Sequence, residues 1–295
     1  MKRHLQMYLA ELVGTFLLVL FGTGAVAAAV LTGAQSGLWQ VAVVWGFGVT
    51  LAIYATAAVS GAHLNPAVTL AMALWRSDEF PRERVLPYWV AQLAGGVLAG
   101  LVVLVTFGPF IERFELERGL ERGGAGSEAS AMVFGEYFPN PAIFGTDDAA
   151  YDLVSPLAAA GVEALGTGIL VFMIFALVDR RNAARPAWLA PFFIGFTVAV
   201  LISLFAPITQ AGWNPARDFG PRIVAFFAGW GDVAIPGPRN GFWAYIVGPL
   251  IGGPVGGAIY EYVIRPGLGD QAVESEAALS GSPRSSVAST RDGSR

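Results

Sequence analysis

No aspartate, glutamate, lysine or arginine lies between Leu12 and Ala62, a stretch of more than fifty residues. A helix that crosses a bilayer needs about 20 apolar residues, so this stretch has room for two membrane spans and the turn between them. The whole chain carries 14% charged residues, whereas soluble domains carry about 25%. The sequence therefore predicts an all-α membrane protein that crosses the bilayer several times.

Hydrophobic runs bounded by charges or by Gly/Pro turns predict six membrane spans. We place them near 7–31, 39–59, 85–107, 157–178, 187–205 and 242–264. The N-terminus lacks a convincing cleavage site, so the first span is expected to remain. The chain has no cysteine, which excludes disulfides, thiolate metal sites and thiol catalysis. We expect no cofactor and no metal.

Basic residues indicate the orientation, because loops on the cytoplasmic side carry an excess of Lys and Arg. With six spans, all three basic clusters fall on one side: Lys2/Arg3, Arg76/Arg82/Arg84 and Arg180/Arg181/Arg185. Both termini are then cytoplasmic, and the plasma (inner) membrane is the expected location. The tail 267–295 is rich in Ser, Gly and Ala and is expected to be disordered. The loop 109–155 is external, and its aromatic segment 134–145 suggests a partly ordered vestibule.

The two halves of the chain are similar in sequence, which indicates an internal repeat of 1–108 and 156–266. Three pairs of segments match in the same order: 10–19 with 162–171, 46–49 with 195–198, and 88–100 with 245–257. Each repeat holds three full spans, an odd number, so the second copy enters the membrane from the opposite face. An inverted repeat of this kind is known among transporters with broken helices.

Each repeat also contains an Asn-Pro-Ala triplet, in "GAHLNPAVTL" and in "AGWNPARDFG". Pro66 and Pro215 suit the first turn of a helix, where a missing N–H does no harm. The following segments, 66–75 and 215–227, are too short to cross, since ten residues reach about 15 Å. We predict two re-entrant half-helices that meet at the midplane. Broken backbone at that depth is tolerated where it lines a water-filled cavity.

The triplets place polar groups at the centre of this predicted pore. Asn65 and Asn214 take the capping positions, where Asn is favoured, ahead of Ala67 and Ala216. Two facing helix N-termini carry partial positive charges, which repel cations and protons but accept neutral molecules with oxygen atoms. The plainer alternative is a pair of ordinary Asn-Pro turns.

The paired triplets and the inverted six-span repeat resemble the aquaporin and glycerol facilitator family over residues 6–265. This resemblance implies a homotetramer with a passive pore in each subunit. It assigns Arg217 to the selectivity filter, where its guanidinium donates to a solute and its charge excludes cations. It also implies that Glu11 and Glu163 hold the loops of the half-helices, with a proton relay as the alternative. His63 either supports its loop or gates flow as it protonates.

Aligned with the family, the filter consists of four residues: Trp45, Ile202, Ala211 and Arg217. Water-selective members usually carry a histidine where this chain has Ile202. Residues typical of the glycerol branch follow: Asp218, Arg222, Pro249 and Leu250. Common bacterial glycerol facilitators have an aromatic residue in place of Ala211 and a glycine in place of Ile202. In this respect the filter is more similar to that of nodulin-26-like channels, some of which pass urea or metalloid hydroxides.

The sequence therefore predicts a passive channel in the lipid bilayer for glycerol, water and other small neutral solutes, without a nucleic-acid partner. A water-selective channel and an ion-coupled secondary transporter are the alternatives. A coupled transporter needs an ion site, and the spans offer little beyond Glu11 and Glu163. The spans hold no cluster of catalytic side chains, so we do not expect an enzyme.

Overall fold

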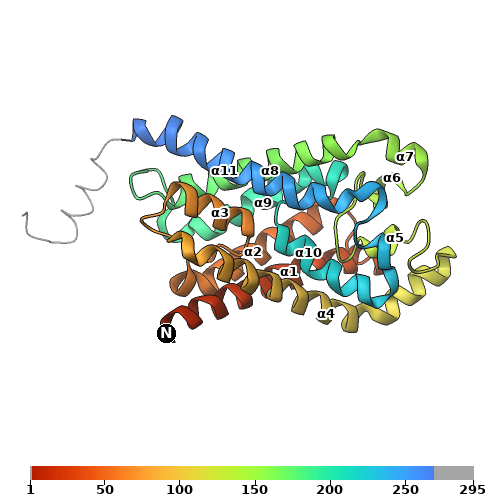
Figure 1. Cartoon of the computed structure of the whole chain (residues 1–295). Helices are drawn as coiled ribbons and strands as arrows, with labels where there is room; N and C mark the ends of the chain where they lie inside the picture. Colours follow the sequence, from red (N-terminus) through yellow and green to blue (C-terminus); the bar gives the residue numbers. More distant parts are fainter. Residues whose placement is uncertain (1, 269–295) are drawn as a thin grey trace, which may run out of the picture.

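The computed structural model describes residues 2–268 and consists of helices and connecting loops (Figure 1). Within this part of the chain, six helical segments are long and apolar enough to cross a membrane. Their main helices are α1 (Lys2–Thr32), α2 (Leu38–Ser60), α4 (Val85–Arg118), α8 (Pro156–Val178), α9 (Ala190–Thr209) and α11 (Ala244–Ile259). The predicted all-α, six-span class is confirmed. Most of the predicted disordered tail, 269–295, lies outside the described residues.

Two short helices lie between consecutive spans, α3 between α2 and α4, and α10 between α9 and α11. Helix α3 (Pro66–Trp75) has the predicted bounds, whereas α10 (Pro215–Ala225) ends before the predicted residue 227 because a π-helical turn, Phe226–Trp230, begins there. In Figure 1, α3 lies nearer the end of the bundle that holds the N-terminus, and α10 nearer the opposite end. The two half-helices therefore point toward each other from opposite ends of the molecule.

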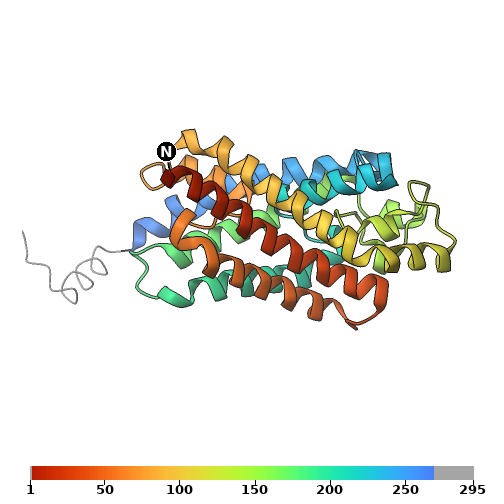
Figure 2. The ribbon, with the colours of Figure 1, turned by 90° about the horizontal axis from the view of Figure 1, so that it is seen from below.

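The packing of the helices follows the internal repeat. Helix α1 packs against α2 and α4, and α8 packs in the same way against α9 and α11. The two repeats meet where α2 lies along α9 (Figure 2). Each half-helix rests on a span of the other repeat, since α3 packs against α11 and α10 packs against α4. The half-helices are thus held by the opposite repeat.

Glycines permit this close packing at matched positions. A Cβ atom built on Gly96 of α4 would lie 2.5 Å from the carbonyl oxygen of Ala216, and one on Gly253 of α11 would lie 3.0 Å from that of Ala67. The first distance is shorter than real Cβ atoms show, and the second is tighter than nearly all of their contacts, so glycine is what lets the half-helix backbone approach so closely.

The loop region starts later than predicted. Helix α4 continues to Arg118 instead of ending near residue 107. In its added turns Phe114 is buried, and Ile111 is buried in a cluster with the loop residues Met132 and Phe134. Burial of apolar residues on one side stabilises these turns of the helix. Three short helices follow: α5 (Glu128–Ala131), α6 (Pro141–Phe144) and α7 (Asp148–Leu153). They gather at the end of the bundle opposite the N-terminus (Figure 1).

Candidate functional site

The tips of the two half-helices are joined by a reciprocal pair of hydrogen bonds. The Asn65 amide donates to the carbonyl oxygen of Trp213 over 2.9 Å, and the Asn214 amide donates to that of Leu64 over 2.8 Å. Each Asn oxygen accepts a backbone N–H of its own helix, at Ala67 and Ala216. Because a side-chain amide has two N–H groups, each Asn keeps one donor beyond this pair. Both Asn residues lie at the wall of one cavity.

The loops before the tips adopt an unusual backbone conformation. Ala62 and Leu64 in the first repeat have φ values of 50° and 52°, and Ala211 and Trp213 in the second have 68° and 46°. Left-handed conformations of residues other than glycine cost on the order of 1–3 kcal/mol each. Such loops need strong partners to hold them.

In the first repeat the partner is Glu11, which is fully buried. One oxygen accepts the backbone N–H of His63 over 2.9 Å, and the other accepts that of Leu64 over 2.7 Å. Ser60 and Gln92 donate to the same carboxylate over 2.7 and 2.8 Å. Burial of a carboxylate is costly unless its oxygens accept hydrogen bonds, so Glu11 and its loop stabilise each other.

Glu163 takes the matching place in the second repeat. It accepts the backbone N–H groups of Gly212 and Trp213 over 3.0 and 2.7 Å, and the hydroxyl of Thr209 over 2.7 Å. It has no counterpart to Gln92, because Pro249 of α11 occupies the position that matches Gln92 in the repeat. The second loop is therefore held with one donor fewer.

His63 lies in a polar and aromatic pocket beside the first loop. Its Nδ1 is 3.3 Å from the hydroxyl of Thr69, and its ring centroid is 4.5 Å from that of Phe80 and 5.2 Å from that of Tyr88. Thr69 also accepts a hydrogen bond from Gln92. His63 is half-buried and also lines the inner cavity described below. Its aromatic and hydroxyl contacts are consistent with the support role, and both support and gating stay predictions.

Two cavities run along the centre of the bundle. The inner cavity of about 410 Å³ passes both Asn caps and reaches Arg84 before α4, and the outer cavity of about 310 Å³ reaches the loop at Ile143. Both cavities are lined by Trp45 and Ile202. The inner one is also lined by the other two residues of the aligned filter, Ala211 and Arg217. The structure thus brings the four filter candidates together where the two cavities meet.

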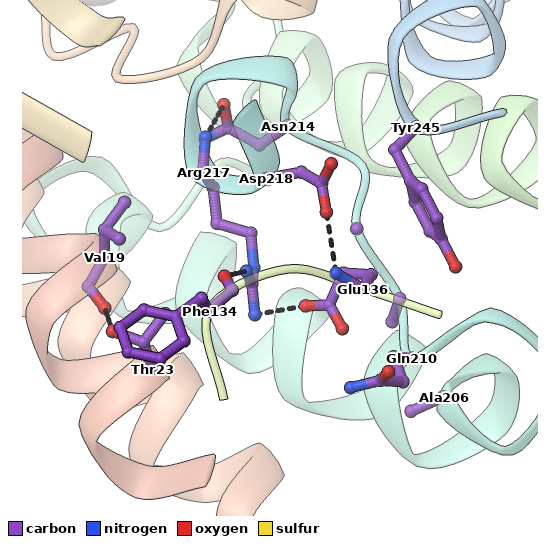
Figure 3. A network of polar contacts seen from close by, with 12 residues as sticks. Val19, Thr23, Phe134, Glu136, Ala206, Gln210, Asn214, Arg217, Asp218 and Tyr245 are labelled. Atoms are coloured by element: carbon purple, nitrogen blue, oxygen red, sulfur yellow. Dashed lines mark hydrogen bonds and ion pairs between the residues drawn. The ribbon is translucent and has the colours of Figure 1, made fainter. Parts of the chain in front are cut away.

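Arg217 extends from the first turn of α10 toward the loop segment with Phe134 and Glu136 (Figure 3). Its guanidinium carbon lies 4.4 Å from the centroid of the Trp45 ring. One of its nitrogens donates to the carbonyl oxygen of Phe134 over 3.2 Å, and another forms an ion pair with Glu136. Five N–H groups are available on a guanidinium, so three remain beyond these two contacts.

Asp218 and Arg222 lie behind the filter and not in either cavity wall. They form a buried ion pair with an N–O distance of 2.7 Å. Asp218 accepts the backbone N–H of Glu136 over 2.7 Å, and Arg222 donates to the Glu136 carbonyl oxygen. The pair therefore fixes the segment that carries Glu136. Pro249 and Leu250 also lie away from both cavities, within α11.

Sequence reasoning did not select Glu136. Its contact with Arg217 joins residues about eighty positions apart, through an irregular loop that no periodicity describes. The sequence did contain one indication of its importance, because Glu136 is the one acidic residue in the aromatic segment 134–145. An ionisable residue in apolar surroundings is a candidate for function.

These features define a class of protein. Six spans arranged as two packed repeats, with two half-helices joined tip to tip beside a lined conduit, describe a membrane channel.

Comparisons with known proteins identify the family. The family model of the major intrinsic protein matches residues 1–260, so the chain belongs to the major intrinsic protein family. It is 42% identical over 262 residues to a propanediol uptake facilitator of Citrobacter freundii, covering 88% of this chain and 92% of the relative. It is 41% identical over 258 residues to a glycerol uptake facilitator of Escherichia coli K12, covering 87% of each.

Among solved structures, the aquaglyceroporin from Plasmodium falciparum is similar, with a TM-score of 0.75 and 26% identity over 90% of this chain and 98% of that one. The chain is therefore a multi-pass membrane channel with the aquaporin fold, and not an enzyme.

Proposed function

We propose that the chain is a passive channel for glycerol and other small uncharged solutes, with some water permeation and with exclusion of ions and protons. The composition of the wall where the two cavities meet carries this proposal. Trp45 and Ile202 offer an apolar surface to the carbon atoms of a polyol, while Arg217 offers N–H donors to its hydroxyl oxygens. An apolar wall with a few placed polar groups suits an amphipathic solute.

The relatives support the same solute class, because they are named as facilitators of propanediol and glycerol uptake. A water-selective pore is not favoured. Of the two histidines in the chain, neither stands at the filter position occupied by Ile202. A propanediol is therefore expected to permeate as well as glycerol.

Stopped-flow light scattering of proteoliposomes tests this function. The purified protein is reconstituted, and vesicles are mixed with an osmotic excess of glycerol, propane-1,2-diol or impermeant sucrose. We expect both polyols to enter much faster than they enter empty liposomes, and the sucrose arm to report water flux. Fast water flux combined with polyol entry no faster than in empty liposomes would contradict the proposal.

We also propose the location, the orientation and the oligomeric state of the channel. Basic residues precede α4 and follow α8, which supports cytoplasmic termini in the plasma (inner) membrane. Large apolar side chains are exposed on the outward faces of the spans, and these faces suit contact with lipid and with neighbouring subunits. We infer a homotetramer with one pore in each subunit. Light scattering checks this by measuring the mass of the detergent-solubilised protein.

A further inference from the structure

The wall of the outer cavity carries a side-chain amide directly beside the filter. Gln210 follows the last residue of α9 and precedes the filter residue Ala211. It lines the outer cavity together with Trp45 and Ile202, whereas Ala211 lines the inner cavity. Only 8% of the surface of Gln210 is exposed. A few polar groups fixed in an apolar wall are what orient a small solute, so Gln210 is a candidate for contact with the permeating molecule.

The orientation of this amide is fixed by its neighbours. The oxygen Oε1 of Gln210 accepts the backbone N–H of Tyr137 over 2.7 Å. Because a backbone N–H only donates, the amide oxygen faces Tyr137 and the NH2 group faces away from it. The backbone N–H of Gln210 donates in turn to the carbonyl oxygen of Ala206 over 2.9 Å. In Figure 3 the amide nitrogen of Gln210 lies on the side of Arg217.

The amide nitrogen keeps both of its donors. Within residues 2–268, Nε2 of Gln210 donates to no protein group, and it does not belong to the fully enclosed atoms that lack a partner. Its two N–H groups are therefore open to the outer cavity. Asn140 on the same wall differs, because its amide nitrogen already donates to the carbonyl oxygen of Ala206 over 3.1 Å. Gln210 is thus the better donor of the two amides.

The donors lie on both sides of the narrow passage. Arg217 lines the inner cavity and Gln210 lines the outer one, while Trp45 and Ile202 line both. A polyol that passes between the indole and the isoleucine gives up water from its hydroxyl oxygens, and an oxygen left without a donor costs free energy. The forked guanidinium of Arg217 can serve two neighbouring oxygens. A third oxygen needs a further donor, and Gln210 supplies one on the outer side.

We propose that Gln210 is a further specificity-determining residue, whose side-chain amide donates a hydrogen bond to the third hydroxyl oxygen of glycerol while the other two lie on Arg217. This inference rests on the proposed polyol channel. It gives the outer side of the filter a preference for a triol over a diol, because propane-1,2-diol carries a methyl group where glycerol carries its third hydroxyl.

The measurement is the ratio of glycerol to propane-1,2-diol permeability in proteoliposomes. Gln210→Met keeps the length of the side chain and removes its donors. We expect this variant to lower the ratio about 2- to 10-fold, the effect of losing one neutral hydrogen bond, because the diol has no third oxygen to lose it. The ratio is independent of the amount of protein inserted. Gln210→Ala gives the same expected direction if the Met variant does not insert.

The control must loosen the same loop without changing either cavity, since Gln210→Met also releases the N–H of Tyr137. Arg239 suits this purpose because it donates to the carbonyl oxygen of Phe138, the next residue of the loop, over 2.6 Å and lines neither cavity. We expect Arg239→Met to keep the wild-type ratio, even where it lowers both permeabilities. A loosened loop alters the passage for both polyols alike, whereas a lost donor affects the triol more.

The outcomes separate the two proposals. If wild type conducts neither polyol faster than empty liposomes, the proposed function fails. If wild type conducts both polyols but Gln210→Met keeps the wild-type ratio, or Arg239→Met lowers the ratio as much as Gln210→Met does, the role of Gln210 is overturned and the channel function stands.

Discussion

At the scale of single residues, the site depends on buried carboxylates that hold other groups in place. Glu11 and Glu163 each bind two consecutive backbone N–H groups of a strained loop, and Glu136 binds a guanidinium. None of the three has more than 2% of its surface exposed. Each interaction is therefore shielded from water and is expensive to remove.

Glu163→Ala tests this dependence. The substitution leaves the N–H groups of Gly212 and Trp213 and the hydroxyl of Thr209 without their acceptor. Each unsatisfied buried donor costs about 1–3 kcal/mol, so we expect the free energy of unfolding to fall by about 3 kcal/mol or more. Thermal unfolding in detergent measures the loss. Glu117→Ala, which removes an exposed pair with Arg113, should cost under about 1 kcal/mol, and an equal loss in both variants would contradict the argument.

The residues of the site were predictable to different degrees. The Asn-Pro-Ala triplets and Arg217 stand in short motifs, so their positions follow from local sequence. Glu136 is held at the filter by tertiary contacts, among them the hydrogen bonds of Asp218 and Arg222 to its backbone. These are contacts of an irregular segment, and neither hydropathy nor periodicity encodes them.

At the scale of helices, the half-helices are positioned by backbone contact with the opposite repeat. Gly96 of α4 faces the backbone of Ala216, one residue before Arg217. The bounds of α3 were predicted because Pro66 begins it and Arg76 follows it. The longer α4 and the π turn after α10 were missed, because their ends depend on burial under the loop and not on apolar length.

Gly96→Ala should therefore displace α10. Its new Cβ atom would lie 2.5 Å from the Ala216 carbonyl oxygen, and overpacking of this kind costs about 1–3 kcal/mol. We expect lower thermal stability and lower glycerol flux per molecule. Gly24→Ala in α1 serves as the control, because nothing lies within 4 Å of its added Cβ and alanine favours a helix. Equal behaviour of the two variants would show that α10 is not held by this contact.

At the scale of the whole molecule, the inverted repeat and the distribution of arginines together predict an orientation. The loop with α5–α7 lies at the end of the bundle opposite the N-terminus (Figure 1). Under the positive-inside rule, that loop faces outward and the segment between α8 and α9 faces the cytoplasm.

Because the chain has no cysteine of its own, any maleimide attached to the purified chain reports an introduced cysteine, which gives a test of orientation. Exposed alanines are available on both sides, at Ala149 in α7 and at Ala183 between α8 and α9. We expect a membrane-impermeant maleimide to label Ala149→Cys on intact cells and to label Ala183→Cys only after lysis. The reverse pattern would invert the proposed topology.

The reciprocal amide contacts between the tips link residues that lie 148 and 150 positions apart, and this has a consequence for biosynthesis. When Asn65 leaves the ribosome, its final acceptor at Trp213 has not yet been made, and neither has the Gly253 surface on which α3 rests. The first half therefore cannot complete its packing until nearly all of the chain has been synthesised. A premature stop before α11 would release no smaller working unit.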